Sequence, residues 1–241
     1  MPHTIQIQKL RYKWPGQQDN LLEIDSLSVE RGEHLFLMGA SGSGKSSFLS
    51  LLGGVIIPQE GSLDILGTRV NELRAAQRDI FRADHLGYIF QQFNLVPYLS
   101  VIDNITLPCR FSERRYQRTL DREGSPQKEA IRLLEHLGLS GKELLNKDVT
   151  ELSVGQQQRV AAARALIGSP EVLIADEPTS SLDEDIQEAF LELLFKECKA
   201  EQTTLVFVSH DPRFGRLFDR TLKLESLSNQ VTRRLVEGGK P

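Results

Sequence analysis

Cysteine is scarce in this sequence, which has only Cys109 and Cys198 among 241 residues. The two lie far apart, and neither forms a C-x-x-C pair or has a histidine neighbour, so the pattern excludes cysteine-based metal and redox sites. Long apolar runs are lacking too, since none approaches the roughly 18 residues that a membrane-spanning helix needs. The first residues also lack the charged-then-apolar order of a signal peptide. We therefore expect a cytoplasmic chain, or one that reaches a membrane only through a partner.

An excess of positive charge is missing as well. The formal net charge is -4 at pH 7, whereas non-specific nucleic-acid binding depends on Lys and Arg side chains that neutralise phosphates. We expect no nucleic-acid partner. What the sequence does have is 39% hydrophobic residues, enough for one large α/β domain or for a core with a smaller subdomain.

One stretch carries a nucleotide-binding pattern. Residues 39–46 read Gly-Ala-Ser-Gly-Ser-Gly-Lys-Ser and fit G-x-x-x-x-G-K-[ST], between an apolar run at 35–38 and helical spacing at 47–52. The glycines allow backbone conformations closed to other residues, and the helix N-terminus presents N–H groups and a positive dipole end to phosphate. The residues predicted to bind nucleotide here are Gly39, Ala40, Ser41, Gly42, Ser43, Gly44, Lys45, Ser46 and Ser47.

Two residues of this loop have separate predicted roles. Lys45 is expected to reach the β and γ phosphates, and Ser46 to hold Mg²⁺. The loop predicts a nucleoside triphosphate as ligand, but by itself it does not choose among kinases, GTPases and ATPases.

Apolar patterns predict two kinds of strand. Alternation at Ile5 and Ile7 and over 22–29 indicates antiparallel strands with one wet face. Residues 61–67 and 86–90 are further strands bounded by glycine or polar turns. The continuous apolar runs 172–175 and 205–208 are typical of central parallel strands that are buried on both faces.

Helical spacing marks two further segments. An amphipathic crossover helix is predicted from Ile186, Ala189, Phe190, Leu193 and Leu194, and a helix in the middle of the chain from Ala130, Leu133, Leu134 and Leu137. No buried strand pattern is present in that middle part. We interpret it as a helical subdomain, about 93–151, inserted into an α/β core, about 1–92 and 152–241.

Four arginines in this middle part, Arg110, Arg114, Arg118 and Arg122, fall four residues apart. On a helix this spacing stacks like charges along one side. The simpler interpretation is a solvated face, offset by acidic residues nearby in the sequence, which are Glu113, Asp121 and Glu123. The functional alternative is a contact with an acidic partner or with anionic lipid headgroups.

Two carboxylates follow the apolar run 172–175, at Asp176 and Glu177. Because ligands of open α/β sheets bind outside the carboxyl ends of the strands, we expect both beside the phosphate loop. Asp176 is expected to face Mg²⁺, usually through water, and Glu177 to lie nearer the γ-phosphate and polarise the attacking water. An acidic turn after a strand is the simpler alternative.

Residues 152–159, Leu-Ser-Val-Gly-Gln-Gln-Gln-Arg, precede a helix-like stretch and alone would be an ordinary helix start. They resemble the signature motif L-S-G-G-Q of ATP-binding-cassette (ABC) ATPases, with Val154 in place of the first glycine. Other family motifs are matched in order. Gln91 resembles the Q-loop, Asp183 the D-loop, His210 the switch histidine and Tyr12 the aromatic that stacks on adenine. We therefore expect an α/β fold: a P-loop NTPase (RecA-like) core with an N-terminal antiparallel β subdomain and an inserted α-helical subdomain.

The resemblance implies a head-to-tail homodimer that clamps two ATP molecules, each between the P-loop of one subunit and the signature motif of the other. Ser153 and the N–H of Gly155 would then present a helix N-terminus to the γ-phosphate. Hydrolysis removes the phosphate that joins the two halves, and so couples chemistry to dimer opening.

The resemblance also assigns roles to the remaining motif residues. His210 would contact the γ-phosphate, Gln91 would link the metal to the helical subdomain, and Asp183 would run along the dimer seam. ATP and Mg²⁺ are the implied cofactors, with metal contacts from Ser46, Gln91 and Asp176. The choice between ATP and GTP stays open, because stacking on Tyr12 tolerates either base.

Within the family, residues 90–105 resemble the ATPase subunits of bacterial lipoprotein-releasing, macrolide-export and cell-division ABC systems. This resemblance implies an integral membrane permease, contacted by Leu95 to Ile105, and a chain that is peripheral on the inner face of the cell membrane. The competing interpretation is a soluble ABC ATPase acting on DNA, ribosomes or a regulatory partner. The long coiled-coil insertions of DNA-repair members and the second cassette of translation members are missing. The cargo stays open, because the permease would make the substrate contacts.

Overall fold

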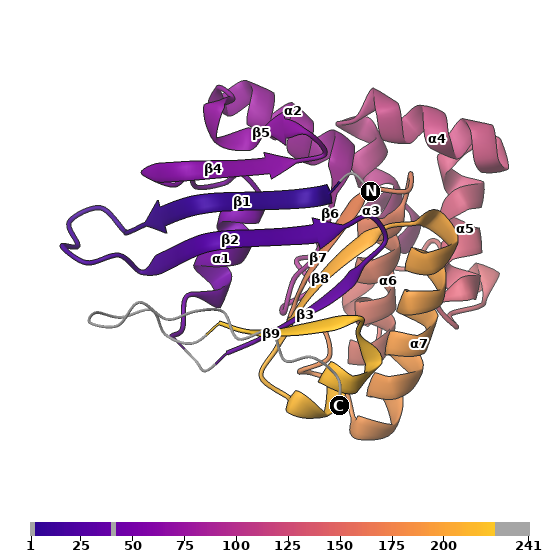
Figure 1. Cartoon of the computed structure of the whole chain (residues 1–241). Coiled ribbons are helices and arrows are strands. Elements are labelled where there is room, and N and C mark those ends of the chain that lie inside the picture. Colours follow the sequence, from indigo (N-terminus) through magenta and orange to yellow (C-terminus); the bar gives the residue numbers. More distant parts are fainter. Residues whose placement is uncertain (1–2, 40–41, 225–241) are drawn as a thin grey trace. The chain divides into compact units, whose positions relative to one another are not determined.

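The computed structural model describes residues 3–39 and 42–224, which fold as two compact units (Figure 1). One unit comprises Met1–Arg82 and Thr204–Pro241, and the other Ala83–Thr203. The predicted helical subdomain, about 93–151, forms part of the second unit. Ala40 and Ser41 of the predicted phosphate loop lie outside the described residues.

An antiparallel sheet occupies the first unit. Strand β1 (His3–Tyr12) pairs with β2 (Leu22–Glu30) on one side and β4 (Glu60–Ile65) on the other, and β5 (Thr68–Arg69) follows β4 at the edge. The alternating apolar residues of β1 and β2 are buried, which confirms the predicted N-terminal antiparallel strands. Gly61 has φ +82, and a Cβ there would lie 2.3 Å from the carbonyl oxygen of Lys9, so only glycine permits this approach of β4 to β1.

Three parallel strands form the other sheet segment of this unit. Strand β3 (His34–Met38) lies between β8 (Thr204–Ser209) and β9 (Arg220–Lys223). The runs 35–37 and 205–208 are at most 1% exposed, so the predicted continuous apolar strands are confirmed. Helix α1 (Lys45–Leu52) follows β3 after the glycine-rich loop.

The end of α1 is capped by arginines from helix α2 (Ala75–His85). Arg78 Nε donates to the carbonyl oxygen of Gly54 at 3.0 Å, and Arg82 Nη1 donates to that of Gly53 at 2.9 Å. These guanidinium groups satisfy carbonyls that a helix C-terminus leaves without intrahelical partners. The remaining short elements of this unit are the 3₁₀ turns η1 (Val70–Glu72) and η5 (Pro212–Leu217).

The second unit is mostly helical and is organised around helix α6 (Val154–Leu166). Strands β6 (Leu86–Ile89) and β7 (Val172–Asp176) pair in parallel. Three consecutive alanines of α6, at 161–163, are fully buried, which lets neighbouring elements approach closely. Helices packed against α6 include α3 (Val101–Thr106), α5 (Pro126–His136) and α7 (Glu184–Glu201). The other elements are η2 (Leu107–Arg110), α4 (Glu113–Glu123), η3 (Lys142–Leu144) and η4 (Val149–Glu151).

The predicted helices are present, but the buried face of α7 differs from the prediction. Ile186 and Ala189 are exposed, whereas Phe190 and Leu194 are buried as predicted. Leu191 and Cys198 complete the buried face. The helical period was predicted correctly, but the first residues of α7 do not pack against the core, so its buried stripe begins at Phe190. In α5, by contrast, the predicted apolar residues are all buried.

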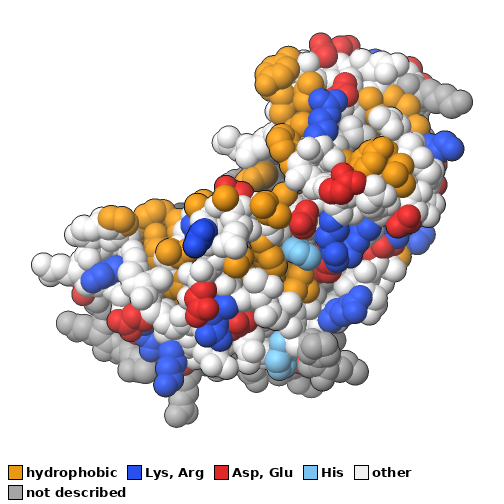
Figure 2. All heavy atoms as spheres, turned by 90° about the horizontal axis from the view of Figure 1, so that it is seen from above, with side chains coloured by type: hydrophobic (Ala, Val, Ile, Leu, Met, Phe, Trp, Pro, Cys, Tyr) orange, Lys and Arg blue, Asp and Glu red, His pale blue; other side chains and the backbone are white. Residues whose placement is uncertain are grey.

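The arginine spacing also has an outcome that neither interpretation foresaw. Arg114 and Arg118 of α4 both pair with Glu171, and Arg122 pairs with Glu129 and Glu201. Arg110 lies outside α4 and pairs with Asp103 at 3.2 Å. Arg110 and Arg114 are solvent-exposed, as the simpler interpretation predicted, but the carboxylates that pair with the four arginines differ from the predicted ones. On the described part of the face in Figure 2, basic and acidic side chains lie beside one another.

Glu171 supplies a stability prediction. Burial raises the pKa of Glu171, but hydrogen bonds from His85 and Arg114 and the charge of Arg118 outweigh it, so the pKa lies below its ordinary value of 4.5. A lowered carboxyl pKa stabilises the fold above that ordinary value, and the stabilisation is lost as the pH falls below it. We expect Glu171→Gln to lower the unfolding free energy at pH 7 by about 1–3 kcal/mol. Urea titrations at pH 7 and pH 3 check this: the difference between the two chains should shrink in acid, and an equal difference at both would contradict it.

Among the helices of the described part of the chain, none is both long enough and apolar enough to cross a membrane.

Candidate active site

The phosphate loop joins β3 to α1 in the first unit. Gly42 and Gly44 have φ +79 and +92, in the left-handed region that favours glycine. A Cβ on Gly39 would lie 2.6 Å from the carbonyl oxygen of Leu224, so the loop start is closed to side chains. Lys45 Nζ donates to the carbonyl oxygen of Gly39 at 2.6 Å, which folds the ammonium group back over the loop. The loop thus presents main-chain groups and one cation, Lys45, and both are suited to binding phosphate.

The hydroxyl groups of this loop differ in exposure. Ser46, in the first turn of α1, is exposed, and Ser47 is 9% exposed. Ser43 is 1% exposed, and no group of the described residues hydrogen-bonds to its Oγ. A buried hydroxyl without a partner destabilises by about 1–3 kcal/mol. A phosphate oxygen would supply the missing partner for Ser43.

His210 lies at the same edge as the phosphate loop. Met38 and Ser209 are register partners in β3 and β8, so Gly39 and His210 leave adjacent strands at the same level. His210 is exposed. A hydrogen bond from Arg213 and the charge of nearby His210 help to keep the pKa of Asp211 below its ordinary value, so the neighbour of His210 is a carboxylate. The tertiary structure therefore brings together Gly39 and His210, which are 171 residues apart in the sequence.

Tyr12, predicted to stack on adenine, is 3% exposed. Its ring contacts Trp14 edge to face, with centroids 5.5 Å apart and an interplanar angle of 78°. Trp14 is 42% exposed and is the only tryptophan of the chain. Stacking by Tyr12 on a base stays a prediction. Of the two rings, Trp14 is the one that is exposed and accessible to a base in this conformation. The sequence signal for Trp14 was its place two residues beyond Tyr12, on the same side of an extended segment.

The two predicted carboxylates end β7 in the second unit. Asp176 is the last residue of the strand and is half-buried. Burial and the charge of Asp176 both raise the pKa of Tyr88 on the paired strand. Glu177 has φ +47, a left-handed conformation that destabilises a non-glycine residue by about 1–3 kcal/mol. Its carbonyl oxygen accepts hydrogen bonds from the N–H and hydroxyl of Ser180, at 3.2 and 2.9 Å.

Gln91 lies at the same edge of this unit as the carboxylates. Ile89 and Ala175 are register partners, so Gln91 and Glu177 each stand two residues beyond a paired position. Gln91 is exposed. The chain after it is held by Arg164 of α6, whose guanidinium donates to the carbonyl oxygens of Phe93 and Asn94, both at 2.6 Å. Sequence analysis missed Arg164, because no local spacing relates it to residues 70 positions away.

The signature motif begins α6. Ser153 is the N-cap: its Oγ accepts from the N–H of Gln156 at 3.3 Å, and Gln156 Oε1 accepts from the N–H of Ser153 at 3.0 Å. Since the hydroxyl oxygen acts as acceptor in the cap, its proton remains able to donate outward. A Cβ on Gly155 would meet only Leu182, at an ordinary contact of 3.8 Å. The described residues around Gly155 therefore leave room for a side chain at this position.

Leu182 also places the D-loop near the signature motif. Asp183, the next residue, is exposed and is the N-cap of α7. In the second unit the structure thus places Gln91 beside the carboxylates at one sheet edge, and places Gly155 of the signature motif beside Leu182, which precedes Asp183. In the first unit it brings together the phosphate loop and His210.

Comparisons with known proteins identify the family of this chain. The sequence profile of the family described as "ABC transporter" matches residues 22–180. A lipoprotein-releasing system ATP-binding protein of Xanthomonas oryzae is 37% identical over 198 residues, which are 82% of this chain and 78% of the relative. A macrolide export ATP-binding/permease protein of Bdellovibrio bacteriovorus is 35% identical over 224 residues, 93% of this chain but 33% of the relative. The chain thus spans about a third of the length of that relative.

A solved structure is similar over nearly its whole length. It is the dimeric, post-hydrolysis state of the ATP-binding cassette MJ0796 of Methanocaldococcus jannaschii, bound to ADP and phosphate. The sequences are 33% identical, the TM-score is 0.80, and the match covers 95% of this chain and 99% of that one. This likeness confirms the predicted α/β, P-loop NTPase class of the fold.

Proposed function

This chain belongs to the ABC transporter family, and from that premise we propose that it hydrolyses ATP to drive a membrane permease of the lipoprotein-release or macrolide-export type. The observation that carries the proposal is the exposed start of α6, where the helix offers Ser153 and Gly155 outward. An exposed helix start that offers a hydroxyl and free N–H groups suits the γ-phosphate of an ATP held by a second copy. The site is then complete only in a dimer.

In the proposed reaction the chain's own groups position phosphate and water. Lys45, released from the carbonyl of Gly39, pairs with the β and γ phosphates. Glu177 accepts a proton from the attacking water, and His210 contacts the γ-phosphate and orients that water. Ser153 donates its hydroxyl proton to the γ-phosphate of the partner's ATP. Loss of the γ-phosphate removes these last contacts and lets the two copies part.

Ser46, Gln91 and Asp176 are the proposed magnesium ligands, Ser46 from the first unit and the other two from the second. They offer a hydroxyl, an amide oxygen and a carboxylate, which are hard oxygen ligands of the kind that Mg²⁺ takes beside phosphates. Ser46 and Gln91 are exposed and Asp176 is half-buried, so each is accessible within its own unit. When bound, the ion would neutralise charge on the phosphate oxygens.

The loop before α3 is the proposed permease contact. Of the predicted segment Leu95 to Ile105, the part that projects is Tyr98, 82% exposed, whereas Val101 and Ile105 are buried. Asn104 fixes this loop: its amide donates to the carbonyls of Val96, Leu99 and Ser100 and accepts from the N–H of Val96. We therefore propose that the permease binds the surface around Tyr98 and holds the chain on the inner face of the membrane.

Affinity purification tests this proposal. Tagged Glu177→Gln chain is incubated with ATP and Mg²⁺ and recovered from detergent-solubilised membranes and from cytosol. We expect an integral membrane protein in stoichiometric amount, and at least about a tenfold loss of it in Glu177→Gln with Tyr98→Ala, because a buried interface tyrosine contributes about 2 kcal/mol or more. Tyr116→Ala, at a less exposed aromatic, is the matched control. Recovery only from cytosol, alone or with nucleic acid or ribosomes, would refute the membrane assignment.

Nucleotide binding should be visible in tryptophan fluorescence. Because Trp14 is the only tryptophan and lies against Tyr12, a base that stacks on either ring changes its surroundings. We expect MgATP to shift or quench the emission, and Trp14→Ala to weaken ATP binding by about 1–3 kcal/mol if the indole stacks on the base. Calorimetric titration of the Trp14→Ala and Tyr12→Leu variants separates the two rings. Unchanged affinity in both would contradict base stacking here.

A further inference from the structure

Strands β6 and β7 and helices α6 and α7 of the second unit share one arrangement. Each carries a site residue at one end: Gln91 follows β6, Asp176 ends β7, Ser153 begins α6 and Asp183 begins α7. The opposite end of each element is hydrogen-bonded or ion-paired with an arginine of α4. Figure 1 shows α4 near one end of α5, α6 and α7.

Arg115 connects two of these elements. It is 2% exposed, and its Nη1 donates to the carbonyl oxygens of Ala165 and Ile167, at 3.4 and 3.3 Å, where α6 ends. Its Nη2 donates to the carbonyl oxygen of Leu86, the first residue of β6. Burial lowers the pKa of Arg115 to about 10, so the group is charged at pH 7. One cation therefore ties the end of the signature helix to the start of the strand that leads to Gln91.

Arg114 and Arg118 hold the start of β7. Both donate to Oε1 of Glu171, the residue before the strand, and Arg118 also donates to the carbonyl oxygen of Ser169. Glu171 further contacts His85 at 3.1 Å, just before β6. The starts of both parallel strands are thus bound to α4 and to each other.

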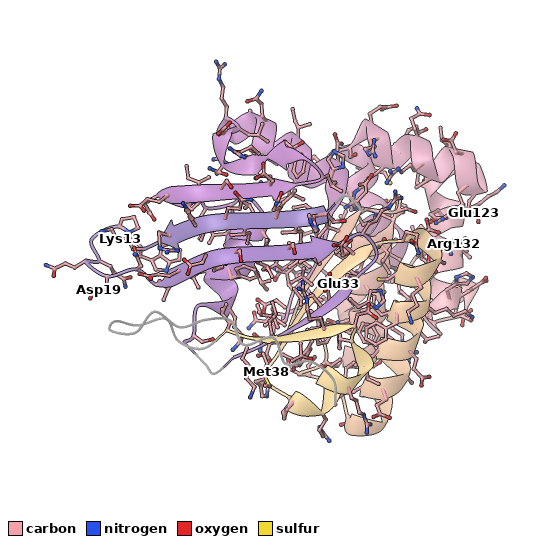
Figure 3. All side chains as sticks on the ribbon, viewed as in Figure 1. Lys13, Asp19, Glu33, Met38, Glu123 and Arg132 are labelled. Atoms are coloured by element: carbon pink, nitrogen blue, oxygen red, sulfur yellow. The ribbon has the colours of Figure 1, made fainter. Side chains whose placement is uncertain are left out.

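Arg122 holds the end of α7. It pairs with Glu201, the last residue of that helix, and with Glu129 of α5, which is 1% exposed. Glu123, one residue on, lies 3.7 Å from Arg132 of α5, and Figure 3 labels these two side chains beside one another. The last turn of α4 is therefore fastened to both α5 and α7.

Backbone packing makes the attachment of α4 close. Gly168, just after α6, has φ +66, and a Cβ there would lie 2.6 Å from Cβ of Arg115 and 2.8 Å from its Cα. Only glycine allows α4 to rest directly on this turn. Close main-chain contact therefore holds Arg115 against this turn.

We propose that α4 is a brace, and that Arg114, Arg115, Arg118 and Arg122 are positioning residues that hold the four site-bearing elements in one alignment. The inference rests on the proposed function, since the alignment matters for ATP-driven closure and hydrolysis. A 13-residue helix such as α6 is about 20 Å long, so a tilt at its braced end displaces Ser153 at the other. Displacements of about 1 Å can slow catalysis by up to about 10²-fold.

The test compares ATP binding with catalysis in the full chain. We expect Arg115→Met to lower kcat by at least about tenfold and to weaken ATP-induced dimerisation in the Glu177→Gln background by a similar factor. ATP affinity should not change, because the phosphate loop belongs to the other unit. Arg115→Lys, which keeps the charge, should recover part of kcat. Gly168→Ala, which displaces α4 without removing a charge, should reproduce the loss.

A control separates positioning from stability. Leu139→Ala creates a cavity at a residue 7% exposed and outside α4, and assays are run at a temperature where circular dichroism shows every variant folded. We expect Leu139→Ala to keep the parent kcat despite a lower melting temperature. If folded Arg115→Met and Gly168→Ala both have the parent kcat and dimerise like the parent, the proposal that α4 is a brace is wrong. If the parent itself neither dimerises with ATP nor hydrolyses it, the proposed function and the brace both fall.

Discussion

In the Glu177→Gln variant, kcat for ATP hydrolysis is expected to fall by about 10²–10⁴-fold, the usual effect of losing a positioned general base. Glutamine keeps the size and hydrogen-bonding capacity of the side chain but cannot accept the proton of the attacking water. ATP binding should be nearly unchanged, because the phosphates are held by the loop around Lys45. The variant should therefore accumulate an ATP-bound dimer, measured by size-exclusion chromatography with light scattering.

The control for this variant is Glu192→Gln, which makes the same chemical change at an exposed position of α7. We expect it to hydrolyse ATP at the parent rate and to form no lasting dimer. The φ of Glu177 is +47, a backbone conformation that is unfavourable for most side chains, and the Glu177→Gln change leaves a non-glycine residue in it. If Glu177→Gln turned over ATP rapidly, another group would have to be the base, and the role given to this residue would be wrong.

Lys45→Met should abolish measurable ATP binding at micromolar nucleotide. The lysine contributes the cation of the loop, and removing one partner of a buried charge pair weakens binding by about 2–5 kcal/mol. In the structure its Nζ bonds to the carbonyl oxygen of Gly39, so the methionine chain also removes an internal contact of the loop. Isothermal titration with MgATP measures the affinity directly.

Lys196→Met, at an exposed position of α7, is the matched control and should bind ATP like the parent. A melting curve distinguishes loss of binding from loss of folding, since Lys45→Met should unfold near the parent temperature without nucleotide. Near-parent ATP affinity in folded Lys45→Met would contradict the assignment of the phosphate loop.

Several features of the site follow from local spacing and could be predicted. The loop at 39–46 needs only eight residues in a row, and two of its glycines, Gly42 and Gly44, have left-handed conformations. The carboxylates were predicted from a continuous apolar run that ends in two acids, and β7 does end at Asp176. Ser153 was identified as a helix start from a pattern confined to one turn, and it forms a capping box.

Other features required the fold. Tyr12 was assigned to a base from its place in the chain, yet its burial beside Trp14 depends on how the chain turns after β1. The phase of the apolar stripe in α7 depends on where that helix meets its neighbours. The arginine stripe was weighed only against acids nearby in sequence, whereas Arg114 and Arg118 pair with Glu171, 57 and 53 residues away.

By itself the sequence determined the ligand-binding loop, the order of the motifs, the class of fold and the type of each major element. These depend on periodicity and on backbone conformation within a few residues, which the order of side chains specifies directly. The tertiary structure decided which strand ends stand level, which arginine meets which carboxylate and which aromatic ring is exposed. Those outcomes depend on packing between segments far apart in the chain, because a charge or a ring pairs with whatever the fold brings within a few ångströms of it.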